Sequence, residues 1–127
     1  MRGKYLFEYA VVRVVPKVER EEFINVGVIL YCRDLKYLQC KHSLNRERLR
    51  SFCGEMDCRE VEEHLMAFEK ICHGDPNGGP IALLDLPSRF RWLTATRSTV
   101  VQTSKVHPGF SEDVEKTLEK LFQQLVL

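Results

Sequence analysis

The chain has 127 residues, of which 44% are hydrophobic and 29% are charged, so one globular domain over residues 1–127 can form without disulfides or a structural metal. Its 19 basic and 18 acidic residues leave a net charge of +1, which excludes the global field that draws proteins to nucleic acids or anionic membranes. No apolar run approaches the roughly 18 residues needed to span a bilayer, and no export signal is recognisable. Five scattered cysteines are typical of a reduced, cytoplasmic protein.

The first half of the chain shows strand patterns and then a helical one. Residues 5–15 alternate and are rich in aromatic and β-branched residues, which predicts a strand. The nearly apolar run 23–32 predicts a central strand, and a tight turn at 33–34 leads into a third strand over 37–43. A short helix is expected over 45–52, because Asn at its start can cap it and Gly follows its end.

The second half predicts two more strands between two longer helices. Residues 57–72 begin with a capping-box-like pattern and carry an apolar stripe of helical spacing. Residues 90–95 and 98–103 have strand composition, and the last helix is expected over 111–125 with Ser111 as its cap. Because the strands are grouped, we predict an α+β fold: a single domain with a mostly antiparallel sheet of about five strands packed against about three helices.

The cysteine and histidine spacings favour structural roles. Cys53 and Cys58 are five residues apart and the next Cys–His pair follows fourteen residues later, which is wider than the paired spacing of zinc sites. Cys40 and His42 share one face of a predicted strand, but two residues do not make a catalytic triad. We therefore expect no metal and no cofactor.

Residues 41–50 contain a basic cluster that could contact phosphates. Its members are Lys41, His42, Arg46, Arg48 and Arg50. However, the charges alternate as on a solvated helix face, and no aromatic residues interleave to stack bases. Nucleic-acid binding is therefore not expected unless this cluster joins Arg89, Arg91 and Arg97 on one surface.

Polar residues interrupt the two apolar strands near the N-terminus. Arg13 lies within a run of valines, and a buried arginine must be paired; Glu21 or Glu22 is the expected partner. Gly27 predicts a bulge or a close approach of another backbone, and Asn25 can bridge turn and strand. Structural pairing explains these residues without a ligand, and a ligand site is the alternative.

The polar segment before the last helix is a candidate anion site. Arg97 is followed by two hydroxyl residues, Ser98 and Thr99, a set that can grip a phosphate or carboxylate together with backbone amides. His107 and a Pro–Gly turn then precede a helix N-terminus, which favours anions. The alternative is a polar hairpin whose hydroxyls face water.

Two motifs, FEYAVVRVVP…EEFINVGVIL and RWLTATRSTVVQTSKVHPGF, resemble the bacterial family described as domain of unknown function 3037, over residues 5 to about 125. The resemblance implies a bacterial single-domain protein without an established activity. The family's genes often neighbour those of a HipA-like protein, which implies a partner role. The motif positions are Arg13, Glu22, Asn25, Gly27, Arg97, Ser98, Thr99, His107 and Gly109.

The leading hypothesis is an interaction or ligand-binding module that partners a HipA-like kinase or accepts an anionic small molecule. Its ligand-binding residues would be Arg97, Ser98, Thr99, His107, Arg13, Glu22 and Asn25. An uncovered sheet edge would also allow a homo-oligomer, although nothing in the sequence demands one.

The alternative hypothesis is a small enzyme acting on a phosphorylated or nucleotide substrate. In it, His107 is the general acid or base, Arg97 stabilises the anion, and Glu22 or Glu21 supplies a second carboxylate. This scheme requires Arg97 and His107 to reach a shared pocket.

Overall fold

The computed structural model describes residues 4–15, 23–45, 47–48, 58–95 and 100–127. The elements in chain order are β1 (Tyr5–Val14), β2 (Ile24–Cys32), β3 (Tyr37–His42), α2 (Cys58–His73), the 3-10 turns η2 (Pro76–Gly78) and η3 (Pro80–Leu83), α3 (Leu86–Leu93), β4 (Val101–Thr103), β5 (His107–Ser111) and α4 (Val114–Leu125). Within these ranges the chain forms a five-stranded antiparallel sheet with three helices. The predicted α+β class is confirmed.

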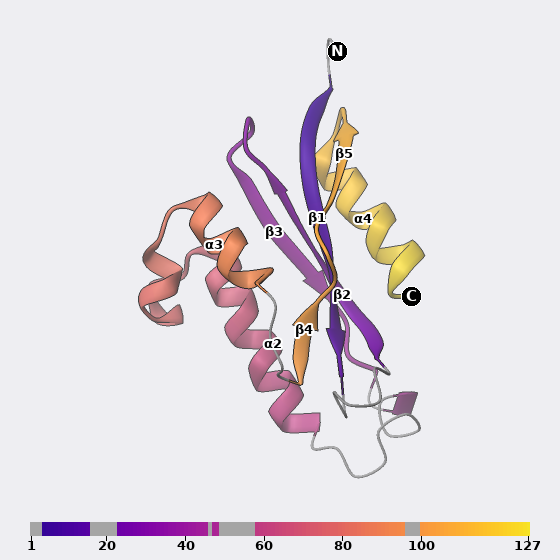
Figure 1. Ribbon diagram of the computed structural model, residues 1–127. Coiled ribbons are helices and arrows are strands. Elements are labelled where there is room, and N and C mark those ends of the chain that lie inside the picture. The colour runs from indigo at the N-terminus through magenta and orange to yellow at the C-terminus, as the bar shows by residue number, and fades with distance from the viewer. Residues whose placement is uncertain (1–3, 16–22, 46, 49–57, 96–99) are drawn as a thin grey trace.

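The sheet has the order β3-β2-β1, with β4 and β5 both lying beside β1. β4 pairs with residues 12–14 of β1, and β5 pairs with residues 5–9. Between them, Ser104 donates its N–H to the Val11 carbonyl at 2.8 Å and accepts the Val11 N–H on its side-chain oxygen at 2.9 Å. Figure 1 shows β4 and β5 as successive parts of one ribbon along β1. We call this interrupted pair the β4–β5 edge.

Helices cover both faces of the sheet. One face packs against α2 and α3, and carries the even-numbered residues Ala10, Val12 and Val14 of β1. The other face packs against α4, on the opposite side of the sheet in Figure 1. β2 lies between β1 and β3, and eight of its nine residues are buried. The apolar run without alternation is therefore explained by burial on both faces.

The two long helices follow the predicted patterns, with one change at a cap. In α2 the predicted stripe is buried, with Val61, Leu65, Phe68 and Cys72 between 0% and 7% exposed. The cap of α4 is Asp113, whose carboxylate accepts hydrogen bonds from the first turn. The prediction of Ser111 as the cap was wrong, because Ser111 is the last residue of β5 and instead accepts the Asp113 N–H.

The largest correction concerns residues 90–95, where a strand was expected. The structure has helix α3 over 86–93, which begins at Asp85 with its carboxylate accepting the Ser88 N–H at 2.9 Å. Phe90 and Leu93 are 4% and 1% exposed. Residues three apart share a face of a helix and not of a strand, so aromatic composition misled the prediction.

Three shorter predictions also change or lie partly outside the described residues. The predicted Pro–Gly turn after His107 is strand β5, and the two-residue turn at 33–34 is a four-residue turn over 33–36. Of the predicted strand 98–103, the structure has β4 over Val101–Thr103, and residues 98–99 lie outside the described ranges. For the predicted helix 45–52, the side chain of Asn45 accepts the Arg48 N–H at 3.0 Å, as a cap would, and most of its remaining residues lie outside the described ranges.

Candidate interaction groove

An open groove of about 1010 Å³ lies on the α2–α3 face of the sheet. It is bounded by the start of α3, the 33–36 turn, the upper part of β1 and the residue before β5. Tyr31 and Phe90 line it with stacked rings whose centroids are 5.1 Å apart. The groove therefore has an aromatic base between a helix and a sheet edge.

Exposed apolar side chains border the groove along the β4–β5 edge. Leu6 and Val106 line it and are 50% and 36% exposed. Leu6 lies opposite Phe110 in the β1–β5 register, and Phe110 is 58% exposed. Neighbouring exposed apolar side chains of this kind are typical of interaction surfaces.

Charged side chains of both signs also line the groove. They are Glu8, Asp34, Asp85, Arg33, Lys36 and Arg91. Among the described residues, none of the six has an ion-pair partner within 4.0 Å. Hydrogen bonds from Ser88 hold the pKa of the Asp85 carboxyl below its usual range, so this charge persists into mildly acidic solution. The groove thus presents six charges with no ion-pair partner within the described part of the chain.

The backbone of β5 adds hydrogen-bonding groups to this surface. Val11 of β1 and Val15, just after this strand, form backbone hydrogen bonds with Ser104 and Val100, respectively. The backbone N–H and C=O groups of the odd-numbered β1 residues therefore point toward the β4–β5 edge. In the β5 register these residues pair with His107, Gly109 and Ser111, so the Phe110 N–H and carbonyl point outward. Within the described ranges β5 pairs with β1 alone. Pro108 fits an outward position because it lacks the N–H.

His107 lies on the opposite face from the groove. It pairs with Tyr9 in the register, and the two rings have centroids 5.3 Å apart. Tyr9 packs against the core under α4, and the His107 side chain is exposed. The predicted partners Arg97, Ser98 and Thr99 lie outside the described residues, so their convergence with His107 stays a prediction.

Arg13 and Asn25 are brought together on adjacent strands. They are register partners in the β1–β2 pair. The guanidinium carbon of Arg13 lies 3.9 Å from the Phe23 ring centroid, and burial lowers the pKa of Arg13. Asn25 donates its amide N–H to the Leu125 carbonyl at 3.1 Å. Glu21 and Glu22, the predicted partners of Arg13, lie outside the described residues.

Within the described part of the chain, two polar atoms of this pair are buried without a hydrogen-bond partner: Arg13 Nε and Asn25 Oδ1. One is a donor and the other an acceptor, and a buried polar group without a partner costs free energy. A small polar ligand or an ordered water could satisfy both groups.

The glycine prediction at position 27 is confirmed on both counts. The β1–β2 register shifts between Val12 and Arg13, opposite Gly27 and Asn25, which is the mark of a bulge. A Cβ at Gly27 would lie 2.9 Å from both His42 Cβ and the Lys41 carbonyl oxygen. The backbone of β3 therefore approaches β2 where only glycine fits.

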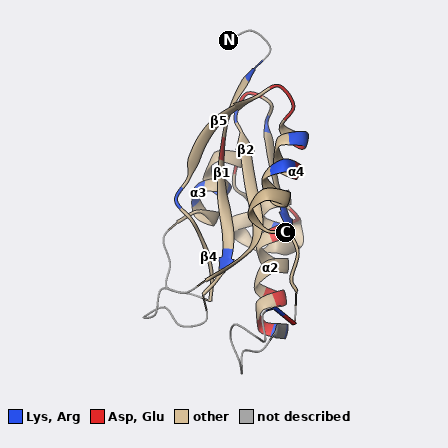
Figure 2. Cartoon of the chain, turned by 90° about the vertical axis from the view of Figure 1, so that its right-hand side faces the viewer, with Lys and Arg blue, Asp and Glu red and all other residues tan. Residues whose placement is uncertain are grey.

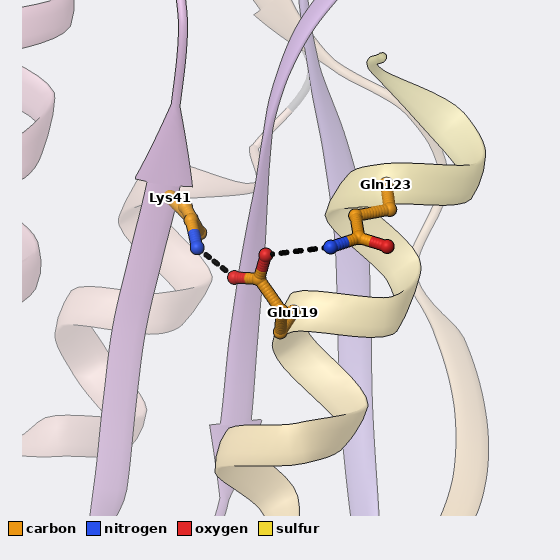
Figure 3. Close-up of polar contacts among 3 residues, drawn as sticks. All are labelled: Lys41, Glu119 and Gln123. Carbon is orange, nitrogen blue, oxygen red and sulfur yellow. Dashed lines mark hydrogen bonds and ion pairs between the residues drawn. The ribbon is translucent and has the colours of Figure 1, made fainter.

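The first two members of the predicted basic cluster, Lys41 and His42, lie on opposite faces of the sheet, and Arg46 and Arg50 lie outside the described residues. Lys41 faces α4, where it pairs with Glu119, and Glu119 also accepts the Gln123 amide at 3.0 Å (Figure 3). His42 faces α2, with its Nε2 atom 3.3 Å from Glu69. Arg89, which would have to join the cluster, is only 9% exposed. Figure 2 shows both signs of charge interspersed along the strands and helices.

The sequence interpretation missed the groove because it placed a strand where α3 lies. Alternation places Leu6 and Glu8 on one face of β1, but it does not predict which element faces them. A helix start was signalled by Asp85 followed by Pro87. This helix-start pattern predicts α3, the element that faces Leu6 and Glu8 across the groove.

Comparisons with known proteins give a family and no activity. Residues 9–126 match the family model described as "Protein of unknown function (DUF3037)". No curated protein and no solved structure matches the chain. Among the described residues, no helix is long and apolar enough to cross a membrane, and no group of three or more His, Cys, Asp or Glu residues is placed to hold a metal ion. The chain therefore belongs to the protein family of unknown function DUF3037.

Proposed function

We propose that this protein is an interaction module that binds an extended segment of a partner protein in the groove between α3 and the β4–β5 edge. The observation that carries the proposal is the conjunction of exposed apolar side chains, Leu6 and Phe110, with an outward-facing strand backbone. Strand addition to a sheet edge is a common mode of peptide recognition. The backbone provides affinity, and the groove provides pockets for side chains.

The occupant is expected to combine apolar and charged side chains. Leu6 and Phe110 are already about half buried, so covering the rest of each side chain contributes about 0.75–1.5 kcal/mol. We expect these two residues to dominate a small interface. The unpaired charges on the groove wall would select a segment of complementary charge. Pro108 has no N–H to offer, so Phe110 supplies the outward donor of β5 and restricts the register.

A HipA-like kinase is the first partner to test, as the family resemblance implies. We expect the purified kinase to bind this protein with an affinity that Phe110→Asp lowers at least about tenfold, which corresponds to about 1.4 kcal/mol. The matched control is Met66→Asp, because Met66 lies on α2 and not on the β4–β5 edge, and is 56% exposed against 58% for Phe110. Titration calorimetry of both variants gives the two dissociation constants.

A displayed library of random peptides tests the groove without assuming the kinase. We expect selected peptides to lose binding to Phe110→Asp and to keep binding to Met66→Asp. Methylation of a peptide backbone N–H facing Phe110 should weaken binding further, because it removes a strand hydrogen bond. Peptides that bind both variants equally would contradict the groove as the interaction surface.

A second candidate is a small polar ligand at Arg13 and Asn25. It is supported by their buried Nε and Oδ1 atoms, which have no hydrogen-bond partner among the residues that the structure describes. An anion accepted by Arg13 would also fit the predicted contribution of Arg97, Ser98, Thr99 and His107. The probe is inorganic phosphate followed by amide chemical shifts. Shifts centred on Arg13 that disappear in Arg13→Gln support this site, and shifts spread evenly over the surface contradict it.

The enzymatic alternative, with His107 as the acid or base, keeps the status of a prediction. It depends on Arg97 and Glu22, which lie outside the described residues. Its test is loss of turnover of a phosphorylated substrate in His107→Asn, and the groove proposal does not depend on it.

A further inference from the structure

Two thiols meet where β3 packs against α2. Cys72 is 1% exposed and belongs to the core cluster under the sheet, and Cys40 packs against the same cluster while staying partly accessible. Both are free cysteines. The neighbouring Cys40 side chain, together with burial, raises the pKa of the Cys72 thiol.

A neighbouring contact fixes the position of this pair. His42 lies two residues after Cys40 on the same face of β3, and Glu69 lies three residues before Cys72 on α2. The His42 Nε2 atom is 3.3 Å from a Glu69 carboxylate oxygen. Strand and helix are therefore held side by side on the flank of the two sulfur atoms.

We propose that Cys40 and Cys72 form a reversible disulfide, with a small-molecule disulfide such as oxidised glutathione as the oxidant. The pair is then a covalent modification site that links the sheet to α2. The proposal is independent of the groove function, because neither cysteine lines the groove.

The reaction is a pair of thiol–disulfide exchanges. The Cys40 thiolate, from the more accessible residue, attacks one sulfur of oxidised glutathione, forming a mixed disulfide and releasing one glutathione thiolate. The Cys72 thiolate then attacks the Cys40 sulfur and expels the second glutathione thiolate. The two cysteine protons end on the two glutathione thiols, so the cysteines are oxidised and the oxidant is reduced by the same two electrons.

The environment of Cys72 determines the rate of the second step. Burial and the contact with Cys40 disfavour its thiolate, Glu69 adds to that effect, and the nearby Arg89 opposes it. His42 is the remaining titratable group of β3 beside Glu69. Because the thiolate is the attacking species, closure of the disulfide should accelerate as pH rises above neutrality.

The test uses the full chain with Cys53→Ser and Cys58→Ser, which leaves Cys32, Cys40 and Cys72. Reduced protein is incubated with oxidised glutathione at several pH values and then digested without reductant. We expect a Cys40–Cys72 linked peptide, a thiol count that falls from three to one, and full reversal by excess reductant. Cys32 is the internal control, because it is 0% exposed and lies on the α4 face of the sheet.

Two further variants separate the proposal from non-specific oxidation. In Cys72→Ser, Cys40 should stop at the mixed disulfide with glutathione, and in Cys40→Ser, Cys72 should stay reduced. Retention of all three thiols, or glutathione on Cys40 of the parent variant without closure to Cys72, would overturn the proposal. The unfolding temperature of the oxidised parent should also exceed that of the reduced protein, since a cross-link constrains the unfolded chain.

Discussion

The two edges of the sheet, β3 on one side and the β4–β5 edge on the other, differ in how many contacts hold them to the helices. β3 is held on both faces: Lys41 pairs with Glu119 of α4 (Figure 3), and His42 contacts Glu69 of α2. On the other side, the β4–β5 edge is interrupted at Ser104 and leaves Phe110 58% exposed. An exposed edge of this kind is normally shielded or shortened in a soluble protein.

From this difference we expect β3 to contribute mainly to stability and the β4–β5 edge mainly to binding. The residues of β3 pack against the helices on both faces of the sheet and form polar contacts with them, so substitutions there should affect stability. The β4–β5 edge contributes less to the core and more accessible surface, so changes there should affect binding. Substitutions on the two sides therefore separate stability from function.

The largest expected effect compares one apolar residue from each side. Leu38→Ala on β3 should lower the free energy of unfolding by about 2–5 kcal/mol, because Leu38 is 3% exposed and its removal leaves a cavity. Phe110→Ala on β5 should change it by no more than about 0.5 kcal/mol. Urea denaturation measures both, and equal losses would remove the distinction between the two sides.

The close approach of β3 to Gly27 should give the next largest effect. In Gly27→Ala, the new Cβ would meet the Lys41 carbonyl oxygen at 2.9 Å, and backbone cannot move aside without breaking the ladder. We expect a loss of about 1–3 kcal/mol in the free energy of unfolding, as for other overpacked sites. Unchanged stability would show that β3 tolerates displacement from β2.

Alkaline pH should weaken the β3 side through Tyr37. Burial, with smaller contributions from Glu115, Cys72 and Asp113, raises the pKa of Tyr37 from 10.0 to about 12. The unfolded chain therefore loses this proton first, so stability is retained below pH 10 and falls as pH rises from 10 toward 12. In Tyr37→Phe this fall should be smaller by an amount on the order of 1 kcal/mol. Identical pH profiles for the two proteins would contradict the assignment.

The smallest effect is expected from the Lys41–Glu119 pair. Both side chains are more than 40% exposed, and exposed ion pairs contribute about 0.2–1 kcal/mol. A double-mutant cycle with Lys41→Met and Glu119→Gln should give a coupling energy in that range, and added salt should reduce it. A coupling energy that added salt does not reduce would contradict an electrostatic contribution from this pair.

Local patterns predicted the parts of the fold whose residues alternate or repeat clearly. The alternation of residues 5–15, the apolar run of β2 and the stripe of α2 all gave the correct elements, and Gly27 gave the bulge. α3 was missed because Phe90 and Trp92 have high strand propensity, while the Asp85 cap and the packing of Phe90 on Tyr31 decide the helix.

The candidate site was less predictable because it is formed by tertiary contacts. Arg13 and Asn25 were singled out from the sequence, and the structure places them side by side. The groove is lined by three segments that are distant in the chain and by Val106, which precedes β5. The Pro108 and Gly109 of β5 are typical of turns. No local pattern predicts that a proline will occupy an outward position of an edge strand.

Amide hydrogen exchange on the free protein and on its complex with the tightest selected peptide tests the central claim most directly. We expect the Phe110 amide to exchange readily in the free protein and to gain protection in the complex. Amides at the start of α3 should also gain protection in the complex. The amides of β3 should be unaffected. Protection confined to β3 and α4, with Phe110 unchanged, would contradict the assignment of the β4–β5 edge as the interaction surface.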